Sequence, residues 1–129
     1  MRITRFWNNL YQVHLSTDCL QQQLAEIRSV TSEYSAIYTD GLNDGARVVS
    51  VAVFRQQVYS PRLSSASSIF NAEANAILLA LKFVAYSDES KFMICLDSLS
   101  CLLTIESCKT QNAFILKIVE IYKKPCCCW

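Results

Sequence analysis

Three acidic residues occupy places where a carboxylate is costly unless it binds a cation. Asp40 ends a strand-like run, Glu73 lies within an apolar helical pattern, and Asp97 follows a second apolar strand-like run. Burying an unpaired charge costs several kcal/mol, so three such placements indicate a shared cation. Hard divalent cations prefer oxygen ligands such as carboxylates. The sequence therefore predicts a metal site built from Asp40, Glu73 and Asp97, and such a site points to catalysis.

The strands that must position these acids follow from composition and alternation. The pattern predicts three antiparallel strands over residues 35–40, 47–54 and 57–59. A turn is expected at residues 43–45, where Asn, Asp and Gly give the composition that hairpins use. A fourth strand is predicted over residues 92–96, which are apolar on both alternating faces, as in a buried parallel strand.

The helices follow from a period of 3.6 residues. The strongest pattern predicts a helix over about residues 68–85, with Glu73 inside its apolar stripe. Two further helices are expected over residues 99–107, capped by Ser98, and over residues 113–122. The order β-β-β-α-β-α-α predicts an α/β fold with a mixed sheet, in which the helical crossover lays the fourth strand parallel to the first. Asp40 and Asp97 would then lie about 5 Å apart, by the spacing of strands.

The length of 129 residues indicates one domain with a real hydrophobic core. Residues 1–33 are expected to be a lead-in. We expect its first 16 residues to be poorly ordered and residues 17–32 to form a short amphipathic helix. Residues 34–124 hold the predicted sheet and helices, and residues 125–129 are a cysteine-rich tail.

The net charge of +1 leaves no global basic field for nucleic acid, so a phosphate-binding surface would have to be local. Four cations are candidates for it, or simply keep the surface soluble: Arg47, Arg55, Arg62 and Lys91. No run approaches the roughly 20 apolar residues that span a bilayer, and the N-terminus lacks a signal-peptide core. We therefore expect no membrane partner and an intracellular protein, nuclear or cytoplasmic.

The seven cysteines show no C-x-x-C pair, and His14 is the only histidine, so a structural zinc site is not expected. A cysteine hydrolase using His14 is disfavoured because nothing places a thiol beside it. The tail residues 126–128 are interpreted as an unselected end, with palmitoylation or adventitious metal binding as alternatives. The remaining cysteines are expected to behave as small apolar residues: Cys19, Cys95, Cys101 and Cys108.

The three acidic motifs together resemble a known family. They read Ile-Tyr-Thr-Asp-Gly over residues 37–41, Ser-Ile-Phe-Asn-Ala-Glu-Ala over residues 68–74, and Ile-Cys-Leu-Asp-Ser over residues 94–98. In this order and spacing the chain resembles the type 1 ribonuclease H domain over roughly residues 34–124. The resemblance is closest to the version carried by non-LTR retrotransposon reverse-transcriptase polyproteins.

The resemblance implies a ribonuclease H-like fold and a hydrolase of the RNA strand in RNA–DNA hybrids that uses two Mg²⁺ or Mn²⁺ ions. Two ions about 4 Å apart can activate a water and stabilise the departing oxygen of an in-line displacement. By resemblance, Asp40 is the acid that both ions share. Glu73 reaches one ion from the helix, and Asp97 holds or positions the other.

The chain departs from the family pattern after Asp97. The family has a fifth strand, a histidine-bearing loop and a fourth carboxylate on a later helix. The only later acids here, Glu106 and Glu120, match neither position and receive no role. The resemblance therefore implies a C-terminally truncated domain, whose activity is expected to be weak or absent.

Other interpretations stay open at this point. Taken singly, Asp40 could make a turn, Glu73 could favour the helix dipole and Asp97 could start a helix. The domain could instead be a non-catalytic remnant that binds nucleic acid or protein, with self-association through an open sheet edge at residues 92–96. It could also be a relic of a decayed mobile element with no selected function.

Overall fold

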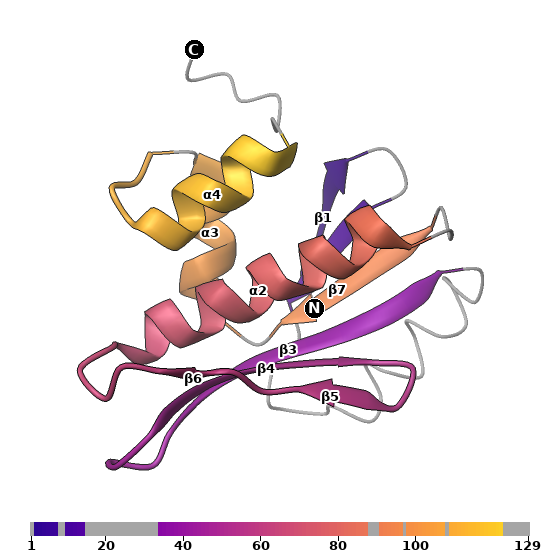
Figure 1. Cartoon of the computed structure of the whole chain (residues 1–129). Helices are drawn as coiled ribbons and strands as arrows, with labels where there is room; N and C mark the ends of the chain where they lie inside the picture. Colours follow the sequence, from indigo (N-terminus) through magenta and orange to yellow (C-terminus); the bar gives the residue numbers. More distant parts are fainter. Residues whose placement is uncertain are drawn as a thin grey trace.

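The structure is a computed structural model that describes residues 2–7, 10–14, 34–87, 91–96, 98–107 and 109–122. Within these ranges the chain is an α/β protein with a mixed sheet and three helices (Figure 1). The strand order is β1-β2-β7-β3-β4-β5, and the short β6 also pairs with β4. The predicted α/β class with a mixed sheet is therefore confirmed.

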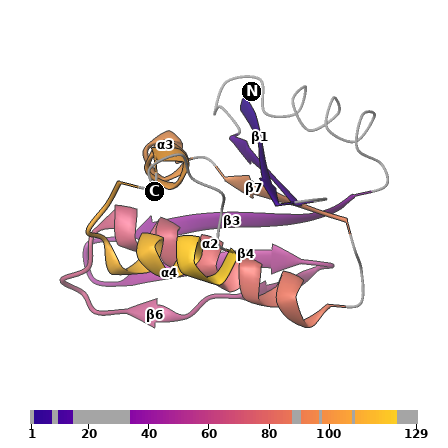
Figure 2. The same cartoon turned by 90° about the horizontal axis from the view of Figure 1, so that it is seen from above.

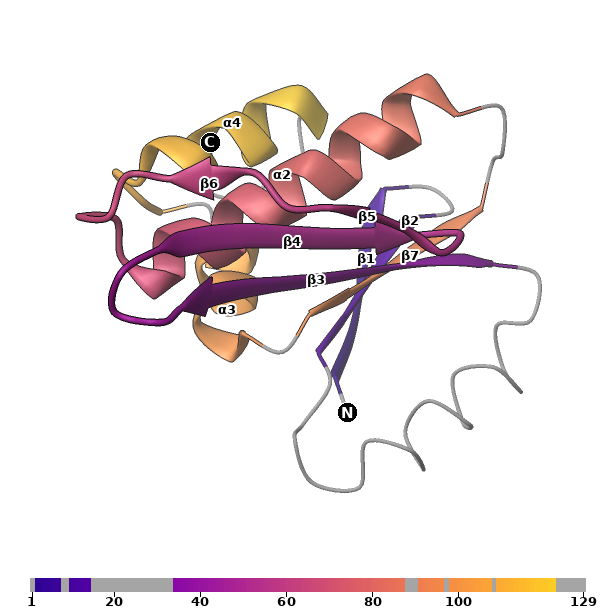
Figure 3. The same cartoon turned by 60° about the horizontal axis from the view of Figure 1, so that its bottom comes forward.

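The antiparallel meander consists of β3 (Ser35–Asn43), β4 (Val48–Phe54) and β5 (Gln57–Tyr59), which lie side by side in Figure 3. β4 and β5 are joined through two residues with positive φ, Arg55 at 52° and Gln56 at 66°. Two such residues in succession match the right-handed twist of the strands they join.

Two details of this region differ from the sequence prediction. β3 runs through Asp40 to Asn43, three residues further than predicted, because its backbone pairing with β4 continues to the partners Asn43 and Val48. β6 (Arg62–Leu63) was not predicted, since a two-residue strand leaves no periodic pattern. It pairs with the start of β4.

β7 (Phe92–Leu96) has the predicted bounds and the predicted place. It pairs in parallel with β3, from Ser35 opposite Phe92 to Tyr38 opposite Cys95. All five of its residues are buried, as expected of a central parallel strand.

The N-terminal residues correct two predictions. β1 (Arg2–Trp7) and β2 (Leu10–His14) form an antiparallel hairpin, and β2 pairs in parallel with the whole of β7. Residues 2–7 and 10–14 are therefore strands and not part of a poorly ordered lead-in, and β7 is not an open edge of the sheet. The hairpin is held by pairing with a strand about 80 residues later in the chain, which no local periodicity reveals. The helix predicted over residues 17–32 and the tail at residues 125–129 lie outside the described residues.

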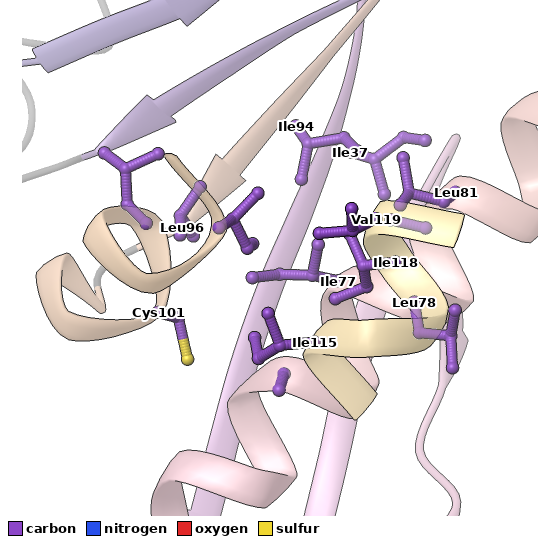
Figure 4. Packing of buried hydrophobic residues seen from close by; sticks show 14 of the residues in the cluster. Ile37, Ile77, Leu78, Leu81, Ile94, Leu96, Cys101, Ile115, Ile118 and Val119 are labelled. Carbon is purple, nitrogen blue, oxygen red and sulfur yellow. The ribbon is translucent and has the colours of Figure 1, made fainter. Parts of the chain in front are cut away.

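The helices α2 (Ile69–Tyr86), α3 (Leu99–Ser107) and α4 (Ala113–Tyr122) match the predicted ranges to within a residue. α2 lies along β3 and β4, and α4 lies beside α2 (Figure 2). One core joins all three helices to β3 and β7 (Figure 4). Its largest fully buried side chains include Ile37, Ile77, Leu81, Phe92, Ile94, Leu102, Ile105, Ile115 and Ile118.

This core fixes which face of α2 meets the sheet. Ile77 and Leu81 are fully buried, and Glu73 lies one turn before Ile77 on the same stripe. α2 is also long and apolar enough, by length and composition alone, to cross a membrane. A helix in a protein core meets the same criterion, and seven residues of α2 are buried here.

The opposite face of the sheet carries a second, smaller cluster, in which the buried Met93 and Cys95 pack with Tyr34, Ala36 and Tyr38. Burial raises the pKa of the Cys95 thiol to about 12. Cys101 is also a buried free cysteine, so both behave as the small apolar residues that were predicted. Cys19 and Cys108 lie outside the described residues.

Candidate functional site

Asp40 belongs to the interior of β3. It pairs with Val51 of β4, and three further residue pairs follow before the strand ends. The turn after β3 lies at residues 44–47, where Asp44 accepts backbone hydrogen bonds from Ala46 and Arg47 at 3.0 and 2.7 Å. Asp40 is therefore held by a sheet ladder and does not make a turn. Its half-buried carboxylate accepts a 2.8 Å hydrogen bond from the Gly41 backbone N–H.

Glu73 lies past the first turn of α2. Ser68 caps the helix, and its Oγ accepts a 3.1 Å hydrogen bond from the Asn71 backbone N–H. The first turn of α2 contains no acidic residue. Because the interaction with the helix dipole falls off within that turn, the dipole does not explain the half-buried Glu73.

Gly41 brings the two acids onto adjoining segments of the chain. A Cβ atom added to Gly41 would lie 2.7 Å from both Cγ and the backbone N of Glu73, and 3.0 Å from Cβ of Ala72. Only a residue without a side chain permits so close an approach of β3 to α2. Asp40 and Glu73 are thus separated by the Gly41 backbone, against which the Glu73 side chain packs.

A buried hydroxyl ties this turn of α2 to the sheet. Ser50 of β4, directly opposite Gly41, donates a 2.7 Å hydrogen bond from Oγ to the carbonyl oxygen of Ala72. Asn75 donates from Nδ2 to the same Oγ at 3.2 Å. Sequence reasoning missed Ser50 and Asn75. The available signal was a single serine in the middle of the apolar run at residues 48–53.

The start of α2 is also tied to the other two helices. Asn112 donates from Nδ2 to Oδ1 of Asn71 at 2.6 Å, and its own Oδ1 accepts the Phe114 backbone N–H at 2.9 Å, at the start of α4. From α3, the Cys101 thiol lies 3.7 Å from the carbonyl oxygen of Phe70, which accepts its hydrogen bond. The turn that carries Glu73 is therefore fixed to the sheet and to both other helices.

Asp97, the third predicted ligand, lies outside the described residues. Its two bonded neighbours are described: Leu96 ends β7, and Ser98 begins the turn that leads into α3. Ser98 accepts a 3.2 Å hydrogen bond at Oγ from the Cys101 backbone N–H. β3 and β7 are linked just before the two acids, where Thr39 donates from Oγ1 to the carbonyl oxygen of Cys95 at 3.1 Å.

The described residues contain no cluster of three or more metal-binding side chains, so the predicted ligand set depends on Asp97. The β3–β7 pairing ends at Tyr38 and Cys95, whereas β3 continues to Asn43 on its β4 side. Beyond Tyr38, no described strand flanks β3 on the β7 side. Side chains from the two faces of the sheet can meet around that flank.

The four candidate phosphate-binding cations do not form one patch. Arg47 and Arg55 lie beyond opposite ends of the seven-residue β4. Arg47 pairs with Asp44 at 3.2 Å, and the backbone N–H groups of Arg47 and Ala46 lower the Asp44 pKa. The Arg55 guanidinium lies 5.0 Å from the centre of the Phe54 ring.

Comparison of the chain with protein-family models, with curated proteins and with solved structures finds no match.

Proposed function

We propose that the chain is a ribonuclease H-like domain that hydrolyses the RNA strand of RNA–DNA hybrids with two divalent metal ions, Mg²⁺ or Mn²⁺. The proposed ligands are Asp40, Glu73 and Asp97. The observation that supports the proposal is the close approach of Gly41 to Glu73, which brings the turn of α2 that carries one half-buried acid against the residue that follows the other, Asp40.

The sheet register supports Asp97 as the third ligand. β3 and β7 are parallel neighbours, and Tyr38 pairs with Cys95. If this register were extended by two residues, it would pair Asp40 with Asp97 at the strand spacing of about 5 Å. Such an arrangement would gather carboxylates from a strand, a helix and a second strand at the flank of β3 that no described strand covers.

The donor set fits hard divalent ions, because carboxylate oxygens are the ligands that Mg²⁺ and Mn²⁺ accept. Bound ions would supply activation of a water molecule and stabilisation of the departing 3′ oxygen. The chain would hold the ions on two fixed elements, because the β3–β4 ladder holds the backbone of Asp40 and the bonds at the start of α2 hold the turn that carries Glu73.

The proposed site has three carboxylate ligands. The later acids, Glu106 on α3 and the exposed Glu120 on α4, do not match the position of the fourth carboxylate in the family pattern. Three carboxylates hold the ions less firmly than four, which weakens the charge stabilisation that the ions provide in the transition state. We therefore propose slow cleavage by these three ligands, with Mn²⁺ tested alongside Mg²⁺.

The test is cleavage of an end-labelled RNA–DNA hybrid by purified, folded protein with each metal. We expect cuts in the RNA strand only, and no cleavage of duplex DNA. Asp40→Asn, Glu73→Gln and Asp97→Asn should each abolish the activity, whereas the exposed control Glu120→Gln should keep it. Cleavage that survives Asp40→Asn would refute the assigned site. Hybrid binding without cleavage by the wild-type chain would favour the non-catalytic binding domain.

A further inference from the structure

Ser50 is a buried polar residue inside an apolar strand. It is fully shielded from solvent, and its neighbours along β4 are Val49 and Val51. Burying a hydroxyl is costly unless it is hydrogen-bonded. The Ser50 Oγ meets this requirement twice, by donating to the Ala72 carbonyl at 2.7 Å and by accepting from Asn75 Nδ2 at 3.2 Å.

Both partners of this hydroxyl flank Glu73. Ala72 precedes it by one residue, and Asn75 follows it by two. A backbone carbonyl has two lone pairs, so the Ala72 carbonyl can bind Ser50 without giving up its place in the helix. The hydroxyl thus connects β4 to the turn that carries Glu73.

Buried side chains interlock little with the sheet at this turn. The buried residues of α2 before Ile77 are alanines, namely Ala72, Ala74 and Ala76, while the half-buried Phe70 packs against the core. Alanine has no side-chain length with which to interlock against the sheet. The hydrogen bond from Ser50 is therefore a direct restraint between β4 and this turn, in addition to the bonds to the other helices.

Ser50 and Gly41 are direct partners on neighbouring strands. One strand contributes the bond that holds α2, and the other leaves the space that the Glu73 side chain enters. We infer that Ser50 is a positioning residue for the metal site, which keeps Glu73 against Gly41, the residue that follows Asp40. This inference rests on the proposed function.

The test compares wild-type protein with Ser50→Ala, which removes the hydroxyl, and with Asn75→Ala, which removes only its second partner. The control is Ile118→Val, a truncation in the core on α4. The first readout needs no metal: the nuclear Overhauser effect between Hα of Gly41 and Hγ of Glu73. The second readout is the dissociation constant for Mn²⁺.

In Ser50→Ala we expect a weaker Overhauser effect and a Mn²⁺ dissociation constant raised about tenfold or more, as for other residues that orient metal ligands. Asn75→Ala should change the Overhauser effect and the Mn²⁺ dissociation constant in the same directions, but by less. If Ser50→Ala does not fold, the Asn75→Ala variant tests the inference in its place. Ile118→Val should lower the melting temperature and leave both readouts unchanged.

An unchanged Overhauser effect and unchanged Mn²⁺ affinity in Ser50→Ala would overturn the inference. Equal changes in Ile118→Val would also overturn it, because they would reflect lost stability alone. If the wild-type protein binds no Mn²⁺, the proposed function fails, and the metal-free readout still decides whether Ser50 positions Glu73.

Discussion

Replacing Gly41 with alanine tests the contact on which the site depends. The new Cβ would lie 2.7 Å from the backbone N of Glu73 and 3.0 Å from Cβ of Ala72. Neither atom is the far end of a flexible side chain, so the variant can form only if α2 moves away from β3. That movement separates Glu73 from Asp40.

The size of the effect follows from two opposing terms. Forcing extra volume into a packed contact costs about 1–3 kcal/mol. Replacing glycine also lowers the conformational entropy of the unfolded chain, which raises the free energy of unfolding by about 0.4–1 kcal/mol. We expect Gly41→Ala to lower the free energy of unfolding by about 1.3 kcal/mol, the difference between the midpoints of these two terms, whose extremes give about 0–2.6 kcal/mol.

The matched control is Gly45→Ala, at the other glycine of the chain. Gly45 has φ of +89° and nothing within 4 Å of an added Cβ, so alanine there is strained without touching α2. Its cost is about 1–2 kcal/mol, from the left-handed backbone. Urea unfolding followed by circular dichroism measures both variants, and Mn²⁺ titration compares their affinities.

Gly41→Ala should lose both stability and Mn²⁺ affinity, whereas Gly45→Ala should lose stability alone. Wild-type stability and wild-type Mn²⁺ affinity in Gly41→Ala would refute the reasoning. The same result would show that β3 and α2 are not in contact at Glu73.

Three further predictions follow from the fold. Cys95 should resist iodoacetamide at pH 8 in the native protein and react after denaturation, because it is buried with a pKa near 12; peptide mass mapping measures this, and native labelling would contradict it. The pKa of Asp44 is lowered in the folded state. The ionised carboxylate therefore stabilises the fold at pH values above its ordinary pKa of 3.8, and this stabilisation is lost as the pH falls. Asp44→Asn should flatten the acid limb of the stability profile, and an unchanged limb would contradict the assignment. Deleting residues 1–14 removes β1 and β2 and exposes the edge of β7, so light scattering should show self-association; a clean monomer would show that the hairpin does not protect that edge.

The elements that were predicted correctly are those in which a short stretch of sequence already shows the apolar pattern of a buried strand or helix. β7 is apolar at all five positions, and α2 repeats its apolar residues at helical spacing, so their locations follow from local pattern. The β1–β2 hairpin was missed because β2 pairs with β7, a strand far away in the sequence. The end of β3 differs from the prediction because an Asp-Gly pair, here at residues 40–41, is typical of the end of a strand, whereas the pairing with β4 continues to Asn43.

The acidic residues of the candidate site could be predicted from the sequence, whereas the residues that hold them in place could not. Asp40 and Glu73 stand out because each interrupts an apolar pattern. The role of Gly41 as a point of close approach depends on where α2 crosses β3, and this crossing point cannot be predicted from the sequence. Ser50 and Asn75 are ordinary polar residues until the fold places them against the turn that holds Glu73.

The shared metal site is the central claim, and anomalous diffraction from crystals soaked in Mn²⁺ tests it most directly. The account predicts a Mn²⁺ peak within about 2.0–2.6 Å of carboxylate oxygens of both Asp40 and Glu73, at the distances of hard-cation coordination. The peak should disappear in Asp40→Asn crystals. Folded wild-type protein with no peak between Asp40 and Glu73, or with Mn²⁺ only at surface acids such as Asp44, would contradict it.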